Sequence, residues 1–333
     1  MSKRTLIRDL LPNQWVSGIY AIQNCQLGTT KTGKPFIKCI LGDRSKKVPG
    51  RMWNASEELF ASLPTDGFVQ VEGQTQPYQG EMQIIIQQIE PAKPTGEDLL
   101  ELLPRTENDI PTMLVEVVRL ITSVQDPALR ALVQAYLDDA PLMGQFRQAP
   151  AAMNLHHAYI GGLLEHTLSM LRLGDMYCKL TPQLNRDLLL VGLFIHDLGK
   201  CSELTWTTGF GYSDRGQLVG HIGEGMLWLD QKARQCEAKG VKIPSAILNV
   251  LLHIVLSHHG RPEFGALKIP ATPEAIAVSL LDNLDAKMQM AITAANRGEG
   301  GMNQPADLHG NFTEKVWALD TRVYRPDPTT VED

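Results

Sequence analysis

Five short segments in the second half of the chain carry histidine and aspartate residues, whose side chains are metal ligands. Five of the nine histidines fall within them. Apolar residues at helical spacing flank each segment. Helices that bring imidazole and carboxylate groups together build a metal centre, and a metal centre with open positions is typical of hydrolytic enzymes. The segments are Glu165-His166-Thr167, His196-Asp197, Gly220-His221-Ile222, His258-His259 and Leu281-Asp282.

His196 and Asp197 end an apolar stretch, residues 188–195, that predicts a helix. Neighbours on a helix point about 100° apart, so both side chains reach one metal cluster only beside the helix end. There an aspartate can bridge two cations while the imidazole binds one. Gly199 permits a tight exit from the helix, and Lys200 then stands where its charge can hold a phosphate oxygen. We predict catalytic roles for Asp197 and Lys200.

Asp282 lies within an otherwise apolar helical stretch, residues 275–284. A buried carboxylate without a partner costs free energy, so Asp282 requires a metal or another cation. Asp285 falls on the same helix face, where it either supports a ligand or meets solvent. His258 and His259 also stand where a helix is expected to end. One such histidine alone is usually a core or surface residue, so the metal prediction depends on all five segments together.

The composition is ordinary for a globular protein, and 333 residues suffice for two domains with a sizeable core. No apolar run approaches the roughly 18–20 residues that a membrane span needs. Residues 1–11 lack the apolar segment of a signal peptide. The five cysteines form no Cys-x-x-Cys pair, which argues against disulfides and a thiolate zinc site. We therefore expect a cytoplasmic protein without a membrane partner.

The net charge of −6 is unevenly distributed along the chain. Residues 1–95 hold 11 Lys and Arg against 8 Asp and Glu, a net of about +3, and the remainder holds 20 against 29, a net of about −9. The basic N-terminal part of the chain favours contact with a polyanion, and the acidic C-terminal part favours metal binding.

The front of the chain alternates with a period of two between Trp15 and Ile89, which predicts strands. Five short strands with one helix between the third and fourth are the pattern of a Greek-key barrel, the OB-fold. The expected strands are 15–22, 36–43, 47–54, 68–73 and 82–86, and the expected helix is 56–60.

The rest of the chain has helical spacing, so we predict a two-domain α+β protein with an all-α second domain. Prolines and charges over residues 91–98 indicate a linker. The expected divisions are a barrel over 1–92, a linker and helical lead-in over 93–150, the helical metal domain over 151–325 and a tail over 326–333. The expected helices are 116–121, 129–137, 161–173, 188–198, 220–238, 243–256 and 273–294.

Aromatic and basic side chains of the barrel can stack on bases and track the backbone of a single strand. Trp15 and Phe68 stand in apolar alternation and are expected in the core instead. His156 and His157 precede the metal segments, where they either touch the nucleic acid or cap the helix. The residues expected to contact nucleic acid are Lys31, Lys34, Phe36, Arg51, Trp53, His156 and His157.

The order of the metal segments resembles the HD superfamily of metal-dependent phosphohydrolases. The resemblance implies two divalent ions, with Mn²⁺ favoured and Fe²⁺, Mg²⁺ or Co²⁺ as alternatives. It implies that His166, His196, Asp197 and Asp282 hold the first ion, and that Asp197, His221, His258 and His259 hold the second.

Within that superfamily, residues 156–167 and 282–288 resemble the YhaM-type bacterial 3′→5′ exoribonucleases. That family also joins an N-terminal OB-fold to a C-terminal HD domain, so the resemblance covers nearly the whole chain. It implies removal of nucleotides from the 3′ end of single-stranded RNA, and of single-stranded DNA in some members. The Gly-Tyr-Pro segment of cyclic-dinucleotide hydrolases is missing after His259. Gly162 stands where some of those relatives carry a glutamate, so a third metal is not supported.

Two alternatives stay open at this point. One is an HD phosphohydrolase or phosphodiesterase acting on small nucleotides, with the barrel serving assembly. The other is a nucleic-acid-binding protein with a vestigial HD site, which is disfavoured because every metal position is filled. The sequence leaves open the native metal, the preference between RNA and DNA, the general acid and whether the chain forms a homo-oligomer.

Overall fold

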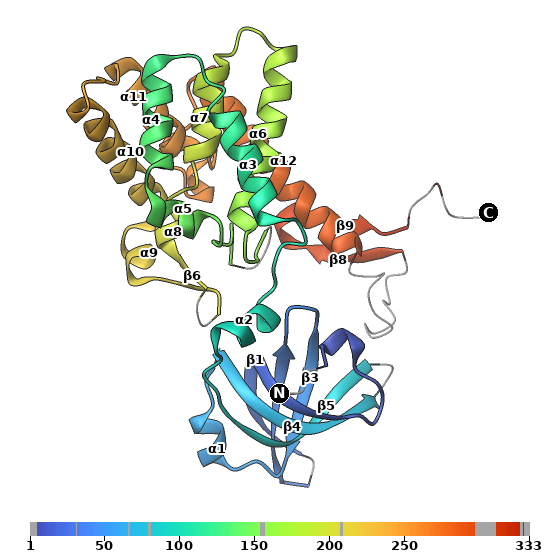
Figure 1. The fold of residues 1–333 in the computed structure, drawn as a ribbon. Coiled ribbons are helices and arrows are strands. Elements are labelled where there is room, and N and C mark those ends of the chain that lie inside the picture. The colour runs from blue at the N-terminus through green and yellow to red at the C-terminus, as the bar shows by residue number, and fades with distance from the viewer. Residues whose placement is uncertain are drawn as a thin grey trace. The chain divides into compact units, whose positions relative to one another are not determined.

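The computed structural model describes residues 5–30, 32–65, 67–78, 81–153, 157–206, 209–296, 311–326 and 329. The chain forms two compact units, each with its own apolar core (Figure 1). The first unit comprises residues 1–105, 207–209 and 291–333, and the second comprises residues 106–206 and 210–290.

A closed five-stranded barrel forms the body of the first unit, as expected for an OB-fold (Figure 1). The strands close in the order β1-β2-β3-β5-β4. Only the β3–β5 pairing within this barrel is parallel. A register shift between Gln23 and Gln26 lets β1 follow β2 further than expected. The strands are β1 (Trp15–Thr29), β2 (Pro35–Gly42), β3 (Lys47–Trp53), β4 (Gly67–Tyr78) and β5 (Glu81–Pro91).

Alternation along the strands decides which side chains fill the barrel. Val16, Tyr20 and Ile22 of β1 point into the core and are almost fully buried. Phe68 is buried as expected, but the prediction for Trp15 is wrong, since its side chain is 53% exposed. Because Val16 faces inward, its neighbour Trp15 must face outward.

Short helices complete the barrel unit. Ser56 caps α1 (Glu57–Ser62), and a short 3₁₀ turn, η1 (Ile7–Asp9), precedes β1. Part of the expected linker is helical: Thr95 and Asp98 form a capping box at the start of α2 (Gly96–Leu102). The Arg44 amide donates to the Glu101 carbonyl at 2.9 Å, which ties α2 to the β2–β3 turn.

Two hairpins lie within residues 151–325, where only helices were expected. One pairs β6 (Leu204–Thr205) with β7 (Gly211–Tyr212). The other pairs β8 (Phe312–Val316) with β9 (Thr321–Tyr324) across the turn η3 (Trp317–Leu319), and it belongs to the first unit. Such short strands carry too few residues for a period of two to be recognised.

The second unit is a set of packed helices. Three of them, α3 to α5, begin with an aspartate cap and a proline in the first turn. The helices are α3 (Ile110–Ile121), α4 (Pro127–Leu137), α5 (Ala140–Phe146), α6 (Gly162–Leu180), α7 (Arg186–Ile195), α8 (Lys200–Glu203), α9 (Asp214–Leu218), α10 (Gly220–Ala238), α11 (Ser245–Ser257) and α12 (Pro273–Asn296), with a 3₁₀ turn η2 (Pro262–Phe264). The end of α12, from residue 291 onward, is assigned to the first unit. Among the described helices, none is both long and apolar enough to cross a membrane.

Helix α7 is the centre of this unit. Its residues from Leu189 to Ile195 are buried on every side, as expected for a helix that is apolar all round. It packs against α6, α11, α3 and α4. The chain leaves α7 at His196 and Asp197, so these two polar residues begin where the apolar core ends.

Candidate metal centre

Asp197 lies between two pairs of histidines and offers one carboxylate oxygen to each pair. Its Oδ2 atom is 3.4 Å from Nε2 of His196 and 3.7 Å from Nε2 of His166. Its Oδ1 atom is 3.5 Å from Nε2 of His258 and 3.7 Å from Nε2 of His221. The carboxylate is only 2% exposed. The geometry is therefore that of a bridging carboxylate with a nitrogen pair on each side.

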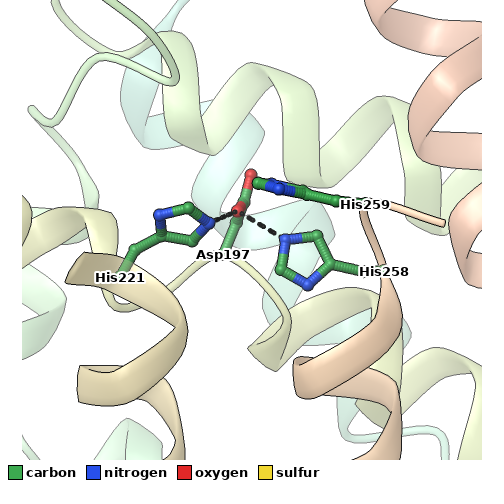
Figure 2. Close-up of side chains that lie close together, drawn as sticks. All are labelled: Asp197, His221, His258 and His259. Atoms are coloured by element: carbon green, nitrogen blue, oxygen red, sulfur yellow. Dashed lines mark ion pairs between the residues drawn. The ribbon is translucent and has the colours of Figure 1, made fainter. Parts of the chain in front are cut away.

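Asp282 and His259 complete the two sides. Asp282 of α12 places Oδ1 3.4 Å from Nε2 of His166. Figure 2 shows His221, His258 and His259 gathered around Asp197. Ligand atoms of these four residues all lie within 4.8 Å of one another. The seven residues predicted as metal ligands thus come to one place from α6, α10, α12 and the ends of α7 and α11.

Backbone carbonyls fix the orientation of three of the imidazoles. Because a carbonyl oxygen only accepts, the Nδ1 atom of each must carry a hydrogen, which leaves Nε2 as the atom that can bind a metal. The Nδ1–H groups donate from His196 to Leu193 at 2.9 Å, from His258 to Val255 at 2.8 Å and from His259 to Phe264 at 2.8 Å.

The donor set fits a divalent cation. Nε2 of His196, His221 and His258 and Oδ1 of Asp197 are buried and have no hydrogen-bond partner within the described part of the chain. Such buried polar atoms cost stability unless something binds them. Imidazole nitrogen together with carboxylate oxygen suits first-row transition metals.

The charges of the centre suit a metal site at neutral pH. Burial favours a raised pKa for Asp197, but Lys200 and His196 outweigh it and hold the pKa well below its ordinary value. The Lys200 Nζ atom donates to Asp197 Oδ2 at 2.6 Å. Burial lowers the pKa of His258. Burial and the neighbouring His258 lower the pKa of His259 to about 3, so its ring stays neutral.

One edge of the centre is open to solvent. The side chains of His166, His196 and His258 are fully buried. Those of Lys200 and His221 are 12% exposed and that of Asp282 is 16% exposed. Lys200, His221 and Asp282 therefore mark an edge at which solvent reaches the centre.

Gly199 has a different role from the one expected. Its backbone is right-handed helical, so it does not provide a left-handed exit from α7. A Cβ atom at this position would lie 2.0 Å from the carbonyl oxygen of His221. Glycine is required here because the turn after Asp197 passes directly against the start of α10.

Two carboxylates lie behind the ligands. Asp285 accepts from Nδ1 of His166 at 2.7 Å and from Nε2 of His157 at 2.9 Å. Glu203 accepts from Nδ1 of His221 at 3.0 Å. Because His157 is 5% exposed and its ring is held by Asp285, the structure does not favour the nucleic-acid contact expected of it. His156 and Lys31 lie outside the described residues.

An exposed aromatic and basic face lies on the barrel. Phe36 of β2 stands opposite Trp53 of β3, with ring centroids 5.3 Å apart. Lys38 stands opposite Arg51 on the same strands. The guanidinium of Arg51 lies 5.4 Å from the ring centroid of Tyr78. Predicted contact residues Phe36, Arg51 and Trp53 thus share one face. Lys34 is exposed beside the start of β2.

Comparison with known proteins identifies both units. A model described as HD domain matches residues 163–287, and a model described as OB-fold nucleic acid binding domain matches residues 15–92. The 3′-5′ exoribonuclease YhaM of Shouchella clausii is 33% identical over 325 residues, covering 96% of each chain. That of Bacillus subtilis is 30% identical over 331 residues, covering 98% of this chain and 99% of the relative.

This chain belongs to the YhaM exoribonuclease family. The predicted resemblance and the predicted architecture, an OB-fold followed by a helical HD domain, are confirmed. The HD match contains all seven predicted metal ligands and also Asp285. Membership therefore rests on both units of the chain.

Sequence reasoning missed several residues of these sites. Glu203 carried no signal, because it lies on a short helix, α8, that was not expected. For Asp285 the sequence did not decide between support of a ligand and exposure to solvent. Its spacing of three residues from Asp282, which places both on one helix face, was the signal that favoured support. Lys38 and Tyr78 were among the aromatic and basic side chains considered for the barrel but not among the preferred contacts, although alternation in β2 places Lys38 on the face of Phe36.

Proposed function

We propose that this chain is a metal-dependent hydrolase that removes nucleotides one at a time from the 3′ end of single-stranded RNA. The observation that carries the proposal is Asp197, whose two oxygens face separate pairs of Nε2 atoms. Asp197 would serve two divalent ions, which would supply the charge neutralisation that phosphodiester hydrolysis needs. The YhaM relatives are named 3′-5′ exoribonucleases, which supports the direction of attack.

The proposed centre holds two divalent ions, with Mn²⁺ favoured. His166, His196 and Asp282 serve one side of Asp197, and the three other histidines serve the other side. When bound, such cations neutralise the scissile phosphate and lower the pKa of water, which is the chemistry that hydrolysis needs. The second-side ligands are His221, His258 and His259.

The imidazoles, the carboxylates and Lys200 have different roles in the proposed reaction. Neutral imidazoles supply lone pairs without adding charge, and the buried carboxylates offset the charge of the cations. Lys200 is a cation at the open edge, held by Asp197 at 2.6 Å. We assign it the role of holding a phosphate oxygen as negative charge develops. The buried walls around His166, His196 and His258 exclude water from the far side of the centre.

The barrel face binds the strand. Phe36 and Trp53 supply ring surfaces for stacking, while Lys38 and Arg51 face the phosphates. Stacking on aromatic rings tolerates any base and does not require a 2′-hydroxyl, so we expect single-stranded DNA to bind as well. Lys34, exposed beside the start of β2, extends the basic face. All five cysteines are free, which supports a reducing, cytoplasmic setting.

The test is an assay with Mn²⁺ and single-stranded RNA that carries a 5′ label in one sample and a 3′ label in another. We expect a descending ladder from the 5′-labelled strand. The 3′ label should leave as a mononucleotide in the first turnover. Intact RNA together with hydrolysis of free nucleotides would refute the exonuclease assignment and favour a small-nucleotide hydrolase.

A further inference from the structure

Each side of the metal centre contains one histidine whose Nδ1 is held by a carboxylate. On the first side, Asp285 accepts from His166 at 2.7 Å. On the second side, Glu203 accepts from His221 at 3.0 Å. The other three imidazoles donate to backbone carbonyls instead. The two carboxylates come from different helices, α12 and α8, so each can be altered separately.

Asp285 is built to be an acceptor. Its Oδ2 receives His166 Nδ1 and His157 Nε2, and its Oδ1 receives the Ser169 hydroxyl. A carboxylate that already receives two other donors acts as an acceptor toward His166, so the hydrogen between them is on Nδ1 of His166. Its Nε2 lone pair then points toward Asp197 and Asp282.

His157 fixes Asp285 from the other side. The Tyr159 hydroxyl lies 2.7 Å from Nδ1 of His157, and Asp285 Oδ2 lies 2.9 Å from its Nε2, so both ring nitrogens are held. The backbone of His157 is left-handed, with a φ of 48°. A Cβ atom on Gly162 would lie 2.0 Å from the His157 carbonyl oxygen, so glycine lets α6 begin beside it. This tight turn holds the His157 ring in place.

Glu203 is equally well fixed. Its Oε1 atom accepts from both the backbone N–H and the Nδ1–H of His221, each at 3.0 Å. Its carbonyl accepts from the Ser213 amide at 2.9 Å. A Cβ atom on Gly216 would lie 2.2 Å from that carbonyl, so α9 packs directly against it. The carboxylate therefore sets both the position and the tautomer of His221.

We propose that Asp285, supported by His157, and Glu203 are positioning residues that each tune the metal affinity of one side of the centre. The inference rests on the proposed metal site and adds which residues determine the metal affinity of each side. A carboxylate makes an imidazole more basic and orients it more firmly, and loss of such a partner costs about 10- to 100-fold in metal affinity. Removal of either carboxylate should weaken metal binding only on its own side of Asp197.

Isothermal titration of the metal-free full chain with Mn²⁺ tests this. Wild type should bind two ions. Asp285→Asn should weaken one binding step by about 10- to 100-fold and leave the other close to wild type. Glu203→Gln should weaken the other step by a similar factor. The control is Glu237→Gln, an exposed carboxylate on α10, which should leave both steps unchanged.

Histidine NMR gives a second readout that a merely structural role would not change. In metal-free wild type, His166 and His221 should carry their hydrogen on Nδ1. Asp285→Asn should mix the tautomers of His166 alone, and Glu203→Gln those of His221 alone. If Asp285→Asn does not fold, His157→Gln replaces it, because it removes one donor to Asp285 and should weaken the same step more mildly.

The possible outcomes distinguish failure of the positioning roles from failure of the proposed metal centre. Wild type that binds two Mn²⁺ ions, with both variants binding as tightly as wild type, overturns the positioning roles and leaves the metal centre standing. Equal weakening of both steps by either variant overturns the assignment to separate sides. Wild type that binds no Mn²⁺ overturns the proposed centre and this inference together.

Discussion

The metal centre and the barrel face hold their functional side chains in opposite ways. In the centre, each imidazole is anchored through its second nitrogen, and His166, His196 and His258 are fully buried. On the barrel face, Trp53 and Tyr78 are 44% and 48% exposed; Trp53 packs against the ring of Phe36, and Tyr78 lies beside the guanidinium of Arg51. Under the proposed function, bond cleavage therefore depends on fixed atoms, whereas strand binding depends on an exposed surface that accepts any base.

Asp197→Asn should break the centre most completely. An amide cannot serve two cations as the carboxylate does, so we expect hydrolysis of RNA to fall by at least about 100-fold. RNA affinity should be roughly unchanged, because the barrel face is intact. The 5′-labelled RNA assay and a binding titration measure the two effects. Loss of affinity together with hydrolysis would show that the two regions do not act separately.

Metal removal should destabilise the helical unit, because buried Nε2 atoms then lose their partner. Free Mn²⁺ at 100 times its dissociation constant stabilises a single site by about 2.7 kcal/mol. Chelation should therefore lower the melting temperature by several degrees. Calorimetry with and without chelator measures this, and Asp197→Asn should show a smaller shift. An unchanged melting temperature for wild type would contradict a resident metal.

Trp53→Ala should affect binding and leave the chemistry alone. Loss of one stacking ring costs about 1–3 kcal/mol of affinity for single strands. Hydrolysis of a small phosphodiester, which does not need the barrel, should stay near wild type. A fluorescence titration with labelled RNA and a small-substrate assay measure the two quantities. A matching loss on the small substrate would argue against separate roles.

Lys38→Ala should have the smallest effect on RNA affinity, because other cations of the barrel face also contact the phosphate backbone of the RNA. Each lost phosphate contact should reduce the slope of log affinity against log salt by about 0.7 for a single strand. The matched control is Lys268→Ala, an exposed lysine of the other unit. If both variants change the slope equally, the basic face of the barrel is not the binding surface.

The same contrast explains what the sequence could predict. The proposed metal ligands stood out because histidine and aspartate interrupt apolar helices, where only a partner makes them tolerable. Trp15 was misplaced because alternation shows which residues share a face but not which face is inside. His157 and Glu203 depend on tight turns between short elements, and contacts across 128 residues, as between His157 and Asp285, leave no periodic signal.

The proposed ligands of the centre are spread widely along the chain, so they are synthesised at different times. His166 lies in α6, but Asp282 and Asp285 lie in α12, the last helix described. The first side of the centre therefore cannot close until α12 has left the ribosome. By then the five strands of the closed barrel, residues 15–91, have already been made. Under the proposed function, the order of synthesis places strand binding ahead of hydrolysis.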